Sequence, residues 1–318
     1  MRMVPALLVV AAWSTPAVAS AHAPFAFQPG HIDLAIGPDG NTVILDAPEG
    51  LVVVDSGRHP NHAEAILEHA RAVGKPIAAV VNTHWHLDHT TGNRDILAAF
   101  PQARLVATNA GEGALTGFLA DAPARARARA DDASLSSDER ARARRALAAL
   151  EDRAALIPRE PVVAGGAVEL GGRRFELRVA RAAATEADLW LLAPDEQLAV
   201  VGDLLVAPVP FFDTGCEQGW REALDAIAAA DWTTLIPGHG APMGRIEFGR
   251  WRAAFDAWLA CAASDSPAAQ CAEGWMRDAA GFYTAEEAAG LSDQIGPHVV
   301  ERAWEYYAAV AKQRPLSA

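Results

Sequence analysis

Several features that would point to other classes of protein are missing from the sequence. Basic residues are not in excess: 40 Asp and Glu against 27 Lys and Arg give a formal net charge of -13. A general affinity for nucleic acid is therefore not expected, and an anionic substrate would need a local metal or arginine cluster to attract it. No internal repeat or low-complexity linker interrupts the chain. With 51% hydrophobic and 21% charged residues among 318, we predict one large domain, or one domain with a small appendage, acting on a small-molecule substrate.

A long apolar run is also missing. The run from Val4 to Trp13 is shorter than the roughly 20 residues that cross a bilayer, so we predict no integral membrane span. Arg2 precedes this run, and small residues follow it from Ala19 to Ala21, which is the pattern of a secretory signal cleaved before His22. We predict that residues 1–21 are a signal peptide and that the protein is periplasmic or secreted. A retained N-terminal anchor is the alternative.

Cysteine is scarce, with three residues at Cys216, Cys261 and Cys271. In an oxidising compartment, Cys261 and Cys271 are expected to close a small loop and to leave Cys216 unpaired. Three free thiols are the alternative.

Strands and helices alternate in the first part of the chain. Three apolar, largely β-branched runs predict strands, at Asn41–Asp46, Leu51–Asp55 and Ile77–Val81. Apolar residues at helical spacing predict a helix from Pro60 to about Val73. This alternation indicates an α/β layer structure.

Residues 121–157 differ in character, because they are rich in Ala and Arg. Ser136 and Glu139 form a capping-box pattern, which predicts that a helix begins there. The eight arginines from Arg125 to Arg153 are interspersed with acidic residues and are interpreted as a solvated helical face rather than a binding surface. The segment is therefore predicted to be a helical insertion before a second strand-rich block at 162–201.

The pattern after Pro242 is helical to the end of the chain. Trp251, Phe255 and Trp258 share one helical face, and Thr284 with Glu287 forms another capping-box pattern. We predict that residues 246–318 form a C-terminal helical region that packs on the main domain.

The segment from His84 to His89 carries the strongest chemical signal. It reads His-Trp-His-Leu-Asp-His directly after a buried strand. Histidines two apart at a strand end project to the same side and can bind one zinc, while Asp88 and His89 can reach a second metal about 4 Å away. A surface cluster is the alternative, but polar side chains at the end of a core strand are costly unless they have a ligand.

Three other histidines, His59, His62 and His69, fall on or beside the predicted helix. We interpret them as part of its solvated face.

The chain here resembles the metallo-β-lactamase superfamily. The family's H-x-H-x-D-H appears at His84–His89, its glycine-aspartate at Gly202-Asp203 and its late glycine-histidine at Gly238-His239. Val54-Asp55-Ser56-Gly57 also looks like the family's early strand-end motif, whose aspartate supports the metal loop. The resemblance implies a four-layer αββα sandwich over residues 24–245, with the site at one edge.

The resemblance also implies the roles of individual residues. The implied ligands are His84 and His86 for the first metal, Asp88, His89 and His239 for the second, and Asp203 as a bridge. One or two zinc ions per chain are expected, with a metal-held hydroxide as the nucleophile, because bound zinc lowers the pKa of water from about 16 to about 7. Asp88 is the predicted catalytic residue, which orients that hydroxide or passes a proton to the leaving group.

One position departs from the family pattern. Ala184 stands where the family usually has the third histidine of the first site, and no histidine lies between residues 89 and 239. The first site could be weak or empty, leaving one metal on the second set of ligands and Asp203. Glu186 or Cys216 could take the missing place, or the first site could persist with extra water.

The loop from Pro210 to Trp220 is expected to hang over the metal edge. Cys216 in this loop is either a ligand or redox-sensitive residue, or a buried small hydrophobe, and we favour the second. Four aromatic residues are candidate walls of an apolar pocket, although core positions are an equal alternative. They are Trp85, Phe211, Phe212 and Trp220.

Fold resemblance does not choose a substrate. Gly202-Asp203 looks like the glyoxalase-type hydrolases more than the true lactamases, so we predict hydrolysis of an ester, thioester or lactam-like acyl bond. The Phe211–Cys216 loop and the cysteine-bearing tail also resemble an exported branch that accompanies quinoprotein alcohol-oxidising systems. Two alternatives stay open: a non-catalytic metal- or partner-binding periplasmic module, and a mono-iron sulfur-handling oxidoreductase.

Overall fold

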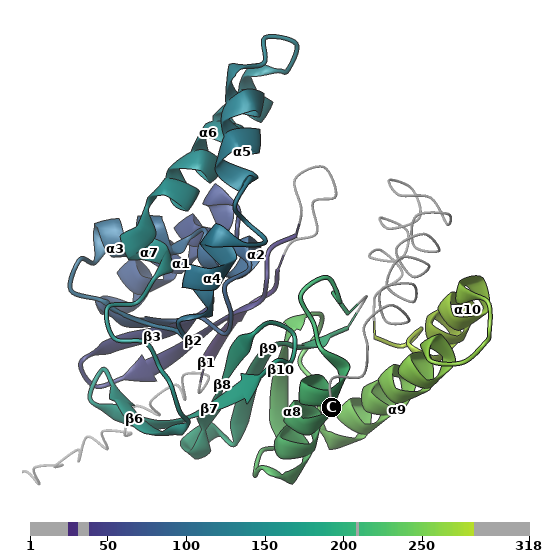
Figure 1. Cartoon of the computed structure of the whole chain (residues 1–318). Helices are drawn as coiled ribbons and strands as arrows, with labels where there is room; N and C mark the ends of the chain where they lie inside the picture. The colour runs from purple at the N-terminus through teal and green to yellow at the C-terminus, as the bar shows by residue number, and fades with distance from the viewer. Residues whose placement is uncertain (1–24, 31–37, 208–209, 283–318) are drawn as a thin grey trace, which may run out of the picture.

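The computed structural model describes residues 25–30, 38–207 and 210–282, which form a layered α/β sandwich (Figure 1). Its two five-stranded sheets have the strand orders β1-β2-β3-β4-β5 and β10-β9-β8-β7-β6. The strands are β1 (Phe25–Gln28), β2 (Thr42–Ala47), β3 (Gly50–Val54), β4 (Ile77–Val81), β5 (Arg104–Val106), β6 (Gly166–Leu170), β7 (Arg173–Arg181), β8 (Ala187–Ala193), β9 (Leu198–Val206) and β10 (Thr234–His239). The helices are α1 (Pro60–Val73), α2 (Leu87–Thr90), α3 (Asn93–Ala99), α4 (Ala110–Thr116), α5 (Ala122–Asp131), α6 (Ser137–Glu151), α7 (Arg153–Leu156), the 3-10 helix η1 (Pro194–Glu196), α8 (Glu217–Ala229), α9 (Arg245–Ala262) and α10 (Ala268–Asp278).

The first sheet is mixed. β1, β2 and β3 pair antiparallel, whereas β3, β4 and β5 run parallel. Side chains alternate across it, so that Val43 and Leu45 enter the core between the sheets while Ile44 packs on the outer side with Ile66 of α1. The predicted strands and the predicted helix from Pro60 to Val73 are confirmed to within a residue or two.

The second sheet is antiparallel from β6 to β9, and β10 then pairs parallel with β9. All nine residues of β9 are buried. Val200 faces the first sheet and Val201 faces the outer helices, because the strand is covered on both sides.

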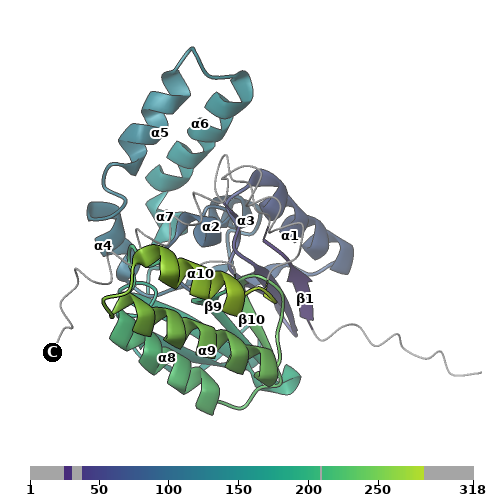
Figure 2. The ribbon, with the colours of Figure 1, turned by 90° about the vertical axis from the view of Figure 1, so that its right-hand side faces the viewer.

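Helices cover both outer faces of the sandwich. α1 and α3 pack on the first sheet, α8 and α9 pack on the second, and α10 packs against α9 (Figure 2). The predicted four-layer αββα architecture is therefore confirmed.

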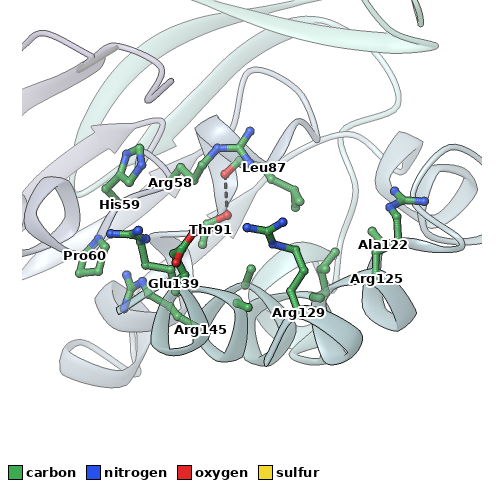
Figure 3. Close-up of a pocket in the computed structure, with 15 residues that line it drawn as sticks. Arg58, His59, Pro60, Leu87, Thr91, Ala122, Arg125, Arg129, Glu139 and Arg145 are labelled. Atoms are coloured by element: carbon green, nitrogen blue, oxygen red, sulfur yellow. Dashed lines mark hydrogen bonds between the residues drawn. The ribbon is translucent and has the colours of Figure 1, made fainter. Parts of the chain in front are cut away.

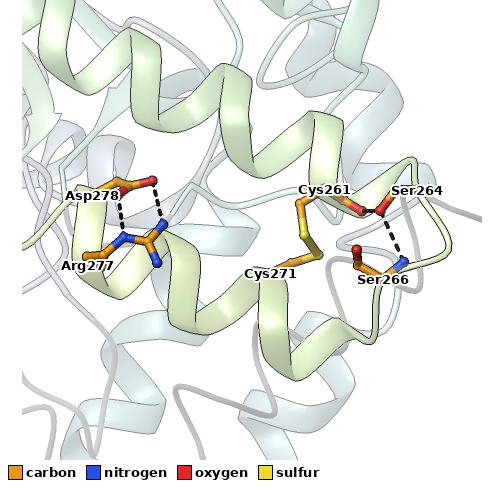
Figure 4. Close-up of a disulfide and its surroundings, with 6 residues drawn as sticks. All are labelled: Cys261, Ser264, Ser266, Cys271, Arg277 and Asp278. Carbon is orange, nitrogen blue, oxygen red and sulfur yellow. Dashed lines mark hydrogen bonds and ion pairs between the residues drawn. A yellow bond between two sulfur atoms is a disulfide. The ribbon is translucent and has the colours of Figure 1, made fainter.

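The described part of the C-terminal region is built into the main core. Trp251, Phe255 and Trp258 of α9 are buried against the second sheet, together with Trp275 of α10. Cys261 and Cys271 form a disulfide that joins α9 to α10 (Figure 4), which confirms the predicted pairing.

The helical insertion stands out from the sandwich as an α5–α6 hairpin (Figure 1). Ser136 caps α6 through its predicted capping box with Glu139. The helix that this pattern predicted ends at Glu151, and the short helix α7 begins at Arg153.

Two predictions lie outside the described residues: the signal peptide at 1–21 and the capping box of Thr284 and Glu287. Among the described residues, no helix is both long enough and apolar enough to cross a membrane.

Candidate metal centre

The predicted ligands lie where strands from both sheets end. His84 and His86 follow β4, and Asp88 and His89 lie on α2. Asp203 is on β9 and His239 ends β10. These two strands are parallel neighbours that pair Pro237 with Gly202, so the two ligands are adjacent although they are far apart along the chain.

Two groups of side chains that could hold a metal ion form at this edge, each with its ligand atoms within 4.8 Å of one another. The groups are His84, His86 and Asp203, and Asp88, His89 and His239. They contain all six predicted ligands, and Asp203, which the resemblance implied as a bridge, falls in the first group.

Asp203 stands between the two groups. Its Oδ2 lies 3.5 Å from His84 Nε2 and 3.8 Å from His86 Nδ1. Its Oδ1 lies 3.2 Å from His89 Nε2 and 3.6 Å from His239 Nε2. Each oxygen of this carboxylate therefore faces one group, which is the arrangement that a bridging ligand needs.

The second group is compact. His239 Nε2 lies 3.1 Å from Asp88 Oδ2 and 3.3 Å from His89 Nε2. Two imidazole nitrogens that face each other repel unless one carries a proton or a cation lies between them. A shared metal ion would satisfy both nitrogens.

Asp55 fixes the orientation of two of the histidines. His89 Nδ1 donates to Asp55 Oδ2 at 2.8 Å, which leaves Nε2 facing the other ligands. Thr83 Oγ1 donates to the same oxygen at 2.7 Å and accepts from His84 Nδ1 at 3.0 Å. Both rings therefore present Nε2 to the site, as a neutral histidine ligand requires. Asp55 has a φ of 60°, a left-handed conformation that is uncommon for a residue other than glycine.

His86 is oriented by the loop after β9. Its Nε2 donates to Thr214 Oγ1 at 3.1 Å, and Thr214 in turn donates to the carbonyl of Ala184 at 2.9 Å. Nδ1 of His86 is left to face Asp203. Sequence reasoning missed Thr214, because a lone threonine 128 residues from its partner carries no recognisable spacing.

Two glycines of the family motifs are required by close packing at the site. A Cβ on Gly238 would lie 2.0 Å from Asp203 Oδ1, and one on Gly202 would lie 2.4 Å from Thr83 Oγ1. Gly202 also has a φ of 54°. The glycine before each ligand therefore allows the strands to bring Asp203 and His239 together.

Electrostatics at the site favour a cation. Burial opposes ionisation of Asp203, but the positive charge of His89 and His84 outweighs it and holds the pKa of Asp203 well below its usual range. Burial likewise opposes a proton on His89, yet the carboxylates of Asp203 and Asp55 raise the pKa of His89 well above its usual range. Burial, assisted by His84, lowers the pKa of His86.

The donor set fits a metal ion. Nε2 of His84 and Oδ1 of Asp203 are buried and have no hydrogen-bond partner among the described residues. Unsatisfied buried polar atoms are costly, and imidazole nitrogens with carboxylate oxygens are the ligands that zinc takes in catalytic sites.

Among the described residues, no other side chain takes the place of the missing histidine at position 184. Ala184 is buried, and its carbonyl accepts from Thr214. Glu186 is exposed, and its carboxylate accepts a hydrogen bond from Trp85 Nε1 at 2.9 Å. Cys216 is half-buried and precedes α8. Neither residue belongs to a metal-holding group. The described residues thus support the alternative in which the first group consists of His84, His86 and Asp203.

Two histidines differ from their interpretation as a solvated face. His59 and His62 are buried, and each faces a polar partner: His59 Nδ1 donates to Asp39 Oδ2 at 2.8 Å, and His62 Nε2 lies 2.8 Å from Thr42 Oγ1. The interpretation was wrong because Asp39 and Thr42 precede the helix in the chain and no helical periodicity reveals them.

Aromatic side chains border the first group on one side. The His86 ring lies 4.5 Å from Trp85 and 5.3 Å from Phe211, and exposed Phe118 lies 6.4 Å from Phe211. Phe211 therefore lies beside the first group as predicted, whereas Trp85 is buried in a small apolar cluster with Ala114, Leu119 and Leu150, which fits the core alternative.

The other two aromatic candidates belong to the core. Phe212 and Trp220 are buried beneath the second sheet's helices and stack on each other at 4.9 Å.

An αββα sandwich with two sets of histidine and aspartate ligands at one sheet edge defines a class of metal-binding α/β proteins. The chain belongs to the metallo-beta-lactamase superfamily, whose family model matches residues 36–239. Membership supports a hydrolase-type function.

Curated relatives match over short stretches. The chain is 38% identical over 58 residues to a hydroxyacylglutathione hydrolase from Synechococcus sp. (strain JA-2-3B'a(2-13)), which covers 18% of this chain and 23% of that protein. It is 42% identical over 50 residues to a linear primary-alkylsulfatase from Pseudomonas sp. (strain ATCC 19151), which covers 15% of this chain and 10% of that enzyme. The matched stretches thus span less than a quarter of either relative.

Solved structures share the fold. A metallo-beta-lactamase family protein from Thermus thermophilus has a TM-score of 0.56 and 18% identity, covering 85% of this chain and 94% of that one. A sec-alkylsulfatase from Pseudomonas sp. has a TM-score of 0.54 and 19% identity, covering 87% of this chain and 47% of that one.

Proposed function

We propose that the protein is an exported zinc-dependent hydrolase that cleaves an ester, thioester or lactam-like acyl bond. The observation that carries the proposal is the convergence of six side chains on one edge, with Asp203 turning one oxygen to each group. The hydroxyacylglutathione hydrolase similarity supports the glyoxalase-type choice.

The residues of the site would bind the metal and orient the attacking water. Zinc held by the six ligands would polarise the acyl carbonyl and lower the pKa of a water molecule to about 7. Burial opposes ionisation of Asp88, but His89, His239 and other nearby positive groups lower its pKa far below its usual range. Asp88 is therefore a persistent anion, suited to accept a hydrogen bond from the attacking water rather than to donate a proton.

Arg58 supports this role of Asp88. Its guanidinium lies 3.6 Å from Asp88 Oδ1, on the side away from His239, which faces Oδ2. The two oxygens of Asp88 are thus held by different partners, which fixes the plane of the carboxylate.

The aromatic border suits an apolar acyl or leaving group. Phe118 is 51% exposed, and its ring lies 5.6 Å from that of Trp85. Together with half-buried Phe211, Phe118 offers an apolar surface beside the first metal-holding group.

Export rests on two observations of different kind. The sequence carries a signal-peptide pattern, and Cys261 and Cys271 are paired in a disulfide, which persists in oxidising compartments. Detection of the mature protein beginning at His22 in a periplasmic or culture fraction would test this part of the proposal.

The enzymatic proposal is tested by metal analysis and turnover together. Protein purified without added metal is expected to contain zinc and to hydrolyse at least one of a generic ester, a thioester and nitrocefin, with the activity lost on chelation and restored by zinc. Asp203→Ala should abolish turnover, while His69→Ala, on α1 and in neither metal-holding group, should leave it unchanged.

The same measurements separate the alternatives. Iron in place of zinc would contradict the hydrolase and favour the sulfur-handling oxidoreductase. Tight metal binding with no turnover of any acyl substrate would instead favour a non-catalytic metal- or partner-binding module.

A further inference from the structure

A cavity of about 460 Å³ lies between the start of α1, the short helix α2 and the α5–α6 hairpin (Figure 3). It is separate from both metal-holding groups, since none of the six ligands lines it. A volume of this size suits a small organic ligand.

Positive charge dominates the lining. Five arginines face one carboxylate, that of Glu139, although the chain as a whole is acidic. The arginines are Arg58 before α1, Arg125 and Arg129 of α5, and Arg142 and Arg145 of α6. Figure 3 shows labelled arginines reaching the cavity from both of its sides. Arg125, Arg129 and Arg142 are exposed, which agrees with the predicted solvated helical face, and they also line this cavity.

Carboxylates of the protein neutralise this cluster only in part. Arg58 pairs with Asp88 and Arg145 pairs with Asp95. Hydrogen bonds from Ser136, assisted by the charge of Arg129 and Arg142, lower the pKa of Glu139, so this carboxylate stays charged beside them. Within the described part of the chain, Arg125, Arg129 and Arg142 have no ion pair within 4 Å. Unpaired guanidinium groups around one cavity repel one another and attract an anion, which they can bind through paired N–H donors.

Buried polar atoms of the lining also lack partners. His59 is 7% exposed, and its Nε2 has no hydrogen-bond partner among the described residues, while its Nδ1 donates to Asp39. Nε of Arg145 is buried without a partner as well, again within the part of the chain that the structure describes. Both atoms are buried, so a ligand in the cavity would reach them only if these side chains shifted.

The remainder of the lining is apolar. Leu87, Ala126, Ala143 and Leu150 contribute hydrocarbon surface between the arginines. A bound molecule would therefore meet both charge and apolar contacts.

We propose that this cavity binds a small organic anion with a carboxylate, sulfate or phosphate head and a short apolar body. The head lies among the guanidinium groups of Arg129 and Arg142, and the body lies against the apolar side chains. The proposal does not depend on the hydrolytic function, because the cavity and the metal centre share no ligand residue; Arg58 borders both.

Isothermal titration of the full-length mature protein with inorganic sulfate, hexyl sulfate and uncharged hexanol tests the proposal, in a phosphate-free buffer at constant ionic strength. Saturable binding is expected for both sulfates, tighter for hexyl sulfate, with none for hexanol. Arg129→Gln/Arg142→Gln should weaken hexyl sulfate binding by about tenfold or more, because two charge-assisted contacts are lost.

The matched control is Arg127→Gln/Arg144→Gln, which removes the same charge from the same two helices outside the cavity. It should change the affinity by less than about twofold, since these exposed side chains do not line the cavity and salt screens their charge. Equal weakening in both double variants would reduce the effect to net charge and overturn the proposal. The proposal would also be overturned if the cavity variant bound the anion normally and chelation of the metal abolished binding, because the anion would then bind to the metal.

Discussion

Removal of one hydroxyl group at Thr214 should weaken metal binding by one of the two metal-holding groups and spare the other. Thr214 Oγ1 accepts from His86 Nε2 and donates to the carbonyl of Ala184. Thr214→Val keeps the shape of the side chain but leaves the His86 N–H without its acceptor, so the ring is free to rotate and to present either nitrogen.

The size of the effect follows from the cost of an unpaired polar group, roughly 1–3 kcal/mol when it is buried. Thr214 is only half-buried, so water can replace part of the lost contact. We therefore expect a loss near the lower end, about tenfold in affinity of the site formed by His84, His86 and Asp203, within the roughly 10–100-fold range typical of partners that orient a metal ligand. The site of Asp88, His89 and His239 should keep its affinity.

Stepwise titration of metal-free protein with cobalt(II), in competition with a chromophoric chelator, resolves the two affinities. Thr214→Ser keeps the hydroxyl and should behave as the parent protein. Two outcomes would refute the reasoning: unchanged first-site affinity in Thr214→Val, or an equal loss in Thr214→Ser.

Three further predictions concern other parts of the molecule. Burial raises the pKa of Asp188 to about 7, so in metal-free protein its contribution to stability should fall by up to about 4 kcal/mol as the pH rises from about 4 to about 7. Urea unfolding should show that the free energy of unfolding depends less on pH in Asp188→Asn than in the parent protein. An unchanged pH dependence would contradict the assignment. Replacement of both Cys261 and Cys271 by Ala should lower the free energy of unfolding by about 3 kcal/mol, the loop-closure value for roughly 10 residues. Reduction of the disulfide in the parent protein should cause the same loss, and the same treatment should not affect the double variant. Gly238→Ala should abolish metal binding measured by equilibrium dialysis, because the added Cβ would meet Asp203 at 2.0 Å, whereas Gly249→Ala, with nothing within 4 Å, should bind normally.

The parts of the fold that the sequence predicted are those with local patterns. The strand runs at Asn41–Asp46 and Leu51–Asp55 and the helix at Pro60–Val73 carry their periodicity within a few residues, and the structure reproduces them. The pairing of Cys261 with Cys271 was likewise visible as a short spacing.

The candidate ligands were predictable for a related reason. Four of them occupy the contiguous segment His84–His89, and the other two follow glycines whose need the structure explains: neither Gly202 nor Gly238 has room for a side chain. A motif can be recognised in a sequence when the backbone geometry permits only one residue type at a position.

Features that depend on distant segments were not predictable. The Asp39–His59 pair, the Thr214 support of His86 and the arginine cavity each join residues that local periodicity does not relate. For the arginines, a helical face exposed to water and one that faces a cavity have the same sequence pattern, and only the packing of the hairpin distinguishes them.

Asp55 shows how the fold prepares the metal centre in advance. It reaches His89 directly and His84 through Thr83, and it does so from a left-handed backbone conformation that costs roughly 1 kcal/mol or more. That conformation persists because the Asp55 carboxylate accepts three hydrogen bonds, from Thr83 N, Thr83 Oγ1 and His89 Nδ1. Both imidazole rings are therefore held with Nε2 toward the site by protein contacts alone. A metal ion that enters does not have to order these rings, so less of its binding free energy is lost to reorganisation.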